Sequence, residues 1–138
     1  MRYIKVARLK GKFVLYLNHY SRIRYLKSYF FMHYFSSEVN ISNINARDSY
    51  VGIVSKDGSN VFVKNIQFNN VKIPFSAYQK KSEYSFAKMN LSNIISDNYL
   101  FYSIRDEKSK IFENDHEIGK FTKNILPVIY EKKLKLLE

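Results

Sequence analysis

The sequence predicts an all-β fold in which short parallel strands recur along the chain. Three segments share the pattern apolar-x-apolar-x-Asn-apolar, and they begin at Val39, Val61 and Met89. The alternation of apolar and polar residues has the two-residue period of a strand rather than the 3.6-residue period of a helix. A unit of about 22 residues that cannot bury its apolar side alone is typical of a parallel β-solenoid.

The similarity between copies extends beyond this first strand. Apolar residues follow the repeated asparagine by eight positions in every copy, at Val51, Ile73 and Phe101, and a decayed fourth copy begins at Ile111. We therefore expect three to four coils, each with two or three strands of two to five residues, stacked about 4.8 Å apart. The second copy is longer than the first, and its extra residues fall around 79–84. The side chains predicted to point inward are Val39, Ile41, Ile44, Val51, Ile53, Val61, Val63, Ile66, Phe68, Ile73, Phe75, Met89, Leu91, Ile94, Phe101 and Ile111.

The recurrent asparagine predicts a ladder of side chains. Asn43, Asn65 and Asn93 occupy the same position of the three copies. Asparagine tolerates the left-handed conformation needed at a bend, and its amide both donates and accepts. We expect the three amides to hydrogen-bond from coil to coil and so to satisfy polar groups that would otherwise be buried unpaired.

Three stretches carry a resemblance to a known family. Residues 51–59, 63–71 and 77–84, read with the repeat, resemble the pectate-lyase-like right-handed parallel β-helix proteins. They are most similar to the last coils of bacterial surface-type members, some of which are linked to CotH-like or lamin-tail modules. The resemblance implies a short right-handed parallel β-helix. It leaves the activity open, because such folds include lyases, hydrolases, adhesins and inert spacers.

The chain divides by composition into three parts: a basic, aromatic segment at 1–38, the coils at 39–115, and a tail at 116–138 that could cover one end of the stack. Members of the family usually have more coils and an export signal, whereas residues 1–38 lack the apolar core and cleavage site of a signal peptide. We therefore expect a terminal fragment of a longer surface or exported protein. No apolar run approaches the roughly 18–20 residues of a membrane span.

The first segment is strongly basic, with eight lysines and arginines against the single acid Glu38. Alternating apolar residues about Lys10-Gly11-Lys12 indicate a hairpin, and the spacing of Ile23, Leu26, Phe30 and Tyr34 indicates a helix after it. Three interpretations stay open: a cap or solvated basic face, a site for nucleic acid or another polyanion, or a segment that is not a natural part of the fold.

Charged and aromatic residues gather at one predicted edge. At equal sequence separations from the three ladder asparagines, one column contains Lys56, Tyr78 and Asp106, and the next contains Asp57, Gln79 and Glu107. Paired carboxylates would suit polysaccharide cleavage, so the candidate catalytic residues are Asp57, Asp106 and Glu107. The candidate ligand-binding residues are Lys56, Tyr78, Lys80, Lys81 and Arg105. The alternative is an ordinary column of solvated turns.

Other chemistry is poorly represented. The chain has no cysteine, which excludes disulfides and thiolate sites, and its three histidines lack metal-ligand spacing. We expect no metal and no cofactor. The function favoured by the sequence is a non-catalytic β-helix module whose partners are a polysaccharide or other polyanion and further coils of a parent protein. The alternatives are a remnant polysaccharide lyase or hydrolase, and polyanion binding through residues 1–38.

Overall fold

The computed structural model describes residues 8–9 and 31–32, by their backbone, and residues 38–137. The fold is mostly β. Its elements in chain order are β1 (Arg8–Leu9), β2 (Phe31–Met32), β3 (Glu38–Lys56), β4 (Asn60–Tyr78), β5 (Lys88–Asp97), β6 (Ser103–Arg105), β7 (Lys110–Glu113), β8 (His116–Ile118), β9 (Lys120–Phe121), the helix α1 (Ile125–Glu131) and the 3-10 helix η1 (Leu134–Leu137).

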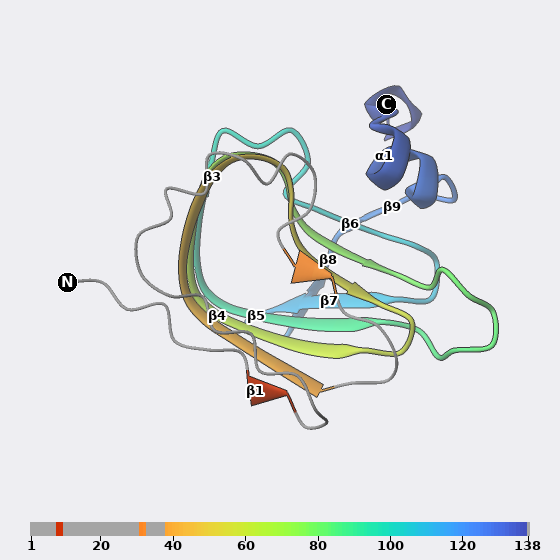
Figure 1. Ribbon diagram of the computed structural model, residues 1–138, viewed down its shortest axis with the longest axis horizontal. Coiled ribbons are helices and arrows are strands. Elements are labelled where there is room, and N and C mark those ends of the chain that lie inside the picture. Colours follow the sequence, from red (N-terminus) through yellow and green to blue (C-terminus); the bar gives the residue numbers. More distant parts are fainter. Residues whose placement is uncertain (1–7, 10–30, 33–37, 138) are drawn as a thin grey trace.

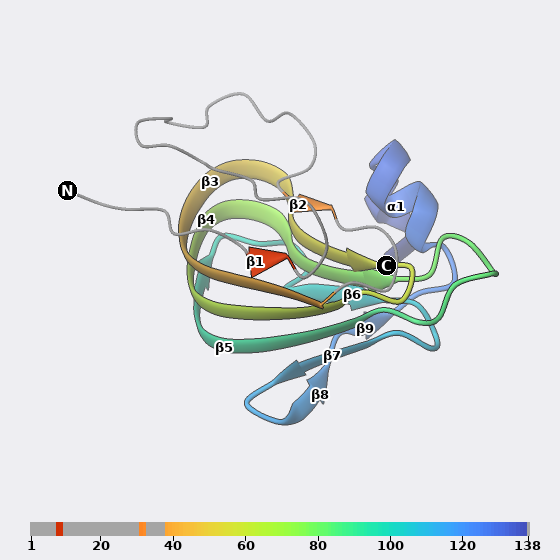
Figure 2. The same ribbon diagram turned by 60° about the horizontal axis from the view of Figure 1, so that its bottom comes forward.

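The strands form one mixed, strongly curved sheet that is nearly closed like a barrel. Figure 1 shows β3, β4 and β5 following the same C-shaped path, and Figure 2 shows them stacked one after another. Their pairing is parallel, and the first apolar residues of the three copies lie opposite one another as Val39↔Val61↔Met89. The predicted register is therefore present in the backbone pairing, and it continues into β7, where Ile111 lies opposite Met89.

The bends that curve the sheet come from residues in the left-handed conformation. Asn43, Asn65 and Asn93 have φ of 58°, 55° and 51°. A second column follows each of these residues along the chain, where Asp48, Asn70 and Asn98 have φ of 57°, 54° and 56°. Asparagine and aspartate are the non-glycine residues that adopt this conformation most readily. Since the chain bends without losing its pairing, β3 and β4 are each 19 residues long, and the predicted short strands are joined into single ones.

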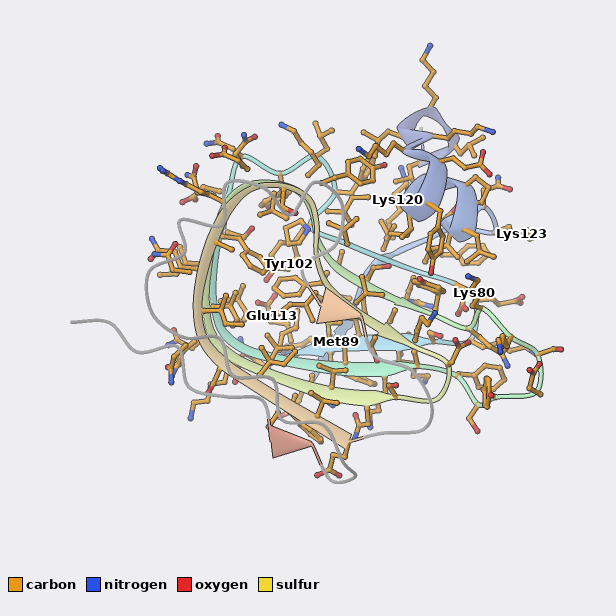
Figure 3. The ribbon with its side chains drawn as sticks, viewed as in Figure 1. Lys80, Met89, Tyr102, Glu113, Lys120 and Lys123 are labelled. Carbon is orange, nitrogen blue, oxygen red and sulfur yellow. The ribbon has the colours of Figure 1, made fainter. Side chains whose placement is uncertain are left out.

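The main core fills the inside of the curve. Of the side chains predicted to point inward, all are buried except Ile94 and Phe101, which are half-buried. The prediction is wrong for Val51, Ile73 and Phe101, which pack in a second cluster with the C-terminal helices instead of in the core inside the curve. Figure 3 shows Met89 inside the curved sheet, where it belongs to the cluster that also contains Phe68 and Phe75. Burial of side chains this large stabilises a fold by roughly 1.5–3 kcal/mol each, so this core accounts for the stack.

A second core lies between the sheet and the C-terminal helices. Ile125, Val128 and Ile129 of α1, with Leu137 of η1, pack against sheet residues that include Val51 and Ile73. Figure 1 shows α1 beside the outer side of the sheet, so this part of the tail covers a flank, while β8, also in the tail, pairs with β7 at the end of the stack. The second half of β3 is consequently buried on both faces, which explains its continuous apolar run from Val51 to Val54.

The ends of the stack differ from the prediction in two places. The decayed fourth copy forms β7 but then reverses at Asn114 and Asp115, whose φ values are 48° and 67°, into the antiparallel strand β8. Near the N-terminus, Phe31 and Met32 lie in the region predicted as helix and instead form β2, parallel to β3. Arg8 and Leu9 form β1, antiparallel to β3. The rest of the predicted hairpin and helix lies outside the described residues.

Candidate functional site

The ladder asparagines hydrogen-bond in order across the three strands. Asn65 Nδ2 donates to Asn43 Oδ1 at 3.0 Å, and Asn93 Nδ2 donates to Asn65 Oδ1 at 2.7 Å. In the second column, Asn70 Nδ2 donates to Asp48 Oδ1 at 2.9 Å. Asn43 and Asn93 are exposed, so the expectation that the ladder satisfies buried groups is wrong. The bends turn these side chains outward, and the ladder instead stabilises the bend at the surface.

The two aspartates of the predicted catalytic edge bind the turn after β4. Asp57, which is buried, accepts hydrogen bonds at Oδ1 from the backbone N–H groups of Lys80 and Lys81 at 2.7 and 3.0 Å. Asp106 accepts at Oδ2 from the N–H of Gln79 at 2.6 Å. The backbone of this turn therefore uses one carboxylate oxygen of each aspartate as a hydrogen-bond acceptor.

The remaining residues of that edge differ in their partners and in their burial. Lys56 is buried with its Nζ 3.7 Å from Asp57 Oδ2, and Tyr78 is buried with its hydroxyl 2.7 Å from that of Tyr130. Arg105 forms an ion pair with Glu117 at 3.1 Å. Glu107, Lys80 and Lys81 are exposed. The structure thus brings Asp57, Asp106 and their neighbours to one edge of the sheet but gives both aspartates structural contacts, and the catalytic and ligand-binding roles stay predictions.

A groove of about 580 Å³ crosses the outer face of β3, β4, β5 and β7, and sequence reasoning missed it. It follows a column of outward side chains that alternates amide and aromatic groups, because the register aligns Asn40, Phe62, Asn90 and Phe112. The other residues that line the groove are Ile41, Ser42, Val63, Lys64, Leu91, Ser92, Asn114 and Asp115. The sequence could have located this column, because each of its residues directly follows the first apolar residue of a copy and therefore points outward.

The groove combines apolar and uncharged polar groups. Phe62 is 37% exposed, a large fraction for a phenylalanine on a sheet. Asn90 Nδ2 donates to Asn60 Oδ1 at 3.1 Å, and Lys88 Nζ lies 5.2 Å from the centre of the Phe112 ring. The lining contains one cation, Lys64, and one anion, Asp115. Phe62 and Phe112 lie two strand spacings apart, roughly 10 Å.

A polar pair, Tyr102 and Glu113, lies inside the curved sheet (Figure 3). Tyr102 donates a hydrogen bond of 2.7 Å to Glu113 Oε1, and its ring meets Phe75 edge-on with centroids 5.5 Å apart. Figure 3 shows the two side chains approaching each other within the curve. Burial raises the pKa of the Tyr102 hydroxyl far above its ordinary value, and the hydrogen bond and charge of Glu113 raise it further. Tyr102 is therefore neutral at physiological pH and acts as a donor.

Within residues 38–137, no three histidine or acidic side chains come together as a cation site. The described part of the chain also contains no helix long and apolar enough to cross a membrane. Comparison of the sequence with protein-family models, and of the chain with curated proteins and with solved structures, finds no match.

Proposed function

We propose that the protein is a non-catalytic, polysaccharide-binding module built as a short right-handed parallel β-helix of the pectate-lyase-like type. The parallel, in-register pairing of β3, β4, β5 and β7, one copy of the repeat against the next, supports the coil architecture. The parallel pairing of β2 with β3, through Phe31↔Ile53, has the same sequence separation as Val39↔Val61 and supports a repeat that extends upstream of residue 38. Such a repeat suits a module that continues the coils of a larger surface or exported protein.

The observation that carries the binding proposal is the groove across β3, β4, β5 and β7. Ligand sites are concave, largely apolar and equipped with a few polar groups that fix orientation. The Phe62 ring, which is 37% exposed, offers flat apolar surface to the C–H face of a sugar, while the amides of Asn40 and Asn90 can donate to and accept from its hydroxyls. Because the one cation and one anion of the lining offset each other, the groove suits a neutral polysaccharide better than a charged one.

The alternative of a lyase or hydrolase has less support. A hydrolase needs two carboxyl groups that face a common space, and either enzyme needs a group that is free to exchange a proton with substrate. Asp57 is 2% exposed and accepts two backbone hydrogen bonds, and Asp106 accepts from Gln79, Lys108 and Ser109. Release of reducing or unsaturated ends from polygalacturonate, abolished by Asp106→Asn, would establish the enzyme interpretation instead.

Affinity electrophoresis in native gels tests the binding proposal. Gels that contain hydroxyethylcellulose, galactomannan or laminarin should retard the protein in at least one case, and Phe62→Ala should remove the retardation. Ile95→Ala is the matched control, since Ile95 is an exposed apolar residue of β5, 55% exposed, outside the groove lining. Equal retardation of wild type and Phe62→Ala, or no retardation by any of the three polymers, would overturn the proposal.

A further inference from the structure

Lysines from separate parts of the chain gather around the C-terminal helices. We define the lysine surface as Lys80, Lys120, Lys123, Lys132, Lys133 and Lys135. Lys80 follows β4, Lys120 lies in β9, and the last three follow α1. Within residues 120–137 five lysines stand against one acid, Glu131. Figure 3 shows Lys80, Lys120 and Lys123 beside α1. A cluster of one sign raises the local concentration of oppositely charged molecules.

Several of these lysines are held in place by aromatic rings. Lys80 Nζ lies 4.7 Å from the centre of the Tyr130 ring, Lys120 Nζ 4.8 Å from that of Phe101, and Lys132 Nζ 5.6 Å from that of Tyr50. Lys120 also donates to the carbonyl of Leu137. Positioned ammonium groups lose less side-chain entropy on binding an anion than freely rotating ones do. The surface is therefore organised before a ligand arrives.

The helix that carries the surface is fixed to the sheet. The Tyr50 hydroxyl donates to the carbonyl of Val128 at 2.7 Å, and the hydroxyls of Tyr78 and Tyr130 lie 2.7 Å apart. Val128 and Ile129 are buried against the sheet. The backbone that carries the last three lysines is consequently anchored to the sheet, which a flexible basic tail would not be.

We propose that the lysine surface binds an anionic polysaccharide, carboxylated or sulfated. One observation favours this ligand over nucleic acid. The rings of Tyr50, Phe101 and Tyr130 each have an ammonium group over them and are not presented for stacking with bases, which single-stranded nucleic acid requires. The surface shares no residue with the groove, so this proposal stands apart from the proposed function.

The test compares two double variants of the full chain with the same change in net charge. Lys123→Glu with Lys135→Glu alters the lysine surface, and Lys108→Glu with Lys110→Glu alters the surface at the start of β7, outside both the lysine surface and the groove lining; all four side chains are exposed. Binding to immobilised polygalacturonate and heparin is measured at about 50 mM salt, where charges beyond roughly 15 Å are largely screened. We expect the first variant to bind at least about tenfold more weakly and the second to stay within about threefold of wild type.

Other outcomes would overturn the proposal. Equal losses in both variants would mean that net charge alone, much of it contributed by residues 1–38, drives retention. Binding that is unchanged in the first variant, or absent in wild type, would remove the surface as a site. Tighter binding to a single-stranded oligonucleotide than to either polysaccharide, lost in the same variant, would assign the surface to nucleic acid instead. Circular dichroism should show the same fold in each variant.

Discussion

Replacement of Asn65 at the centre of the ladder should separate its two contributions to stability, which are its tolerance of left-handed backbone and its side-chain hydrogen bonds. Asn65 has φ of 55° and shares hydrogen bonds of 3.0 and 2.7 Å with Asn43 and Asn93. Left-handed backbone costs about 1–2 kcal/mol for most residues, and each exposed side-chain hydrogen bond contributes about 0.5 kcal/mol. Asn65→Ala should therefore lower the free energy of unfolding by about 2–3 kcal/mol. Asn65→Gly avoids the backbone cost and should lower it by about half as much.

The assay is equilibrium unfolding in urea, followed by circular dichroism, with the midpoint compared at constant m-value. Asn69→Ala is the control, since Asn69 is an exposed asparagine of the same strand and is absent from the left-handed residues. It should change the free energy of unfolding by less than about 0.5 kcal/mol. If the alanine and glycine variants lose the same stability, the backbone argument fails; if both match the control, the ladder contributes nothing.

Three further perturbations have expected outcomes. Gly52→Ala would place a methyl group against the carbonyl of Pro74 and 2.7 Å from Phe68 Cε2, and should lower the free energy of unfolding in urea by about 2–3 kcal/mol. Asp57→Ala should raise the exposure of the turn after β4, measured by faster amide exchange at Lys80 and Lys81, whereas Asp57→Asn keeps an acceptor oxygen and should preserve much of the protection. Because the raised pKa of Tyr102 favours its neutral form in the folded state, stability should fall as pH rises above about 10, the ordinary tyrosine value, and the fall should be smaller in Tyr102→Phe.

The repeat was predictable because stacking imposes the same demands on every copy. A buried position must be apolar in each strand, and a left-handed bend must be Asn, Asp or Gly, so Val39, Val61 and Met89 share a pattern with Asn43, Asn65 and Asn93. The second bend column, with Asp48, Asn70 and Asn98, followed the same rule and could have been found at its fixed spacing from the first.

The C-terminal helix was not predictable from local pattern. It spans only Ile125–Glu131 and contains Pro127. Proline is tolerated there because N–H groups of the first turn have no partner within a helix. A helix this short is unstable in isolation and forms here because Ile125, Val128 and Ile129 bury against the sheet. Its existence, and the burial of Val51 and Ile73 beneath it, thus depends on tertiary contacts between distant segments.

The candidate site was missed because the residues that form it break the repeat. A column of identical asparagines gains hydrogen bonds along the stack, whereas the column of Asn40, Phe62, Asn90 and Phe112 alternates unlike side chains that cannot form such a ladder. The stack gains little stability from a half-exposed Phe62 at an outward position. In a fold whose ladders gain stability from identical residues, an outward column of alternating rings and amides is the feature on which the proposed binding groove depends. The two aspartates beside the turn after β4 are the reverse case. Asp57 and Asp106 have the side chains best suited to acid–base chemistry, yet both accept hydrogen bonds from backbone N–H groups of that turn.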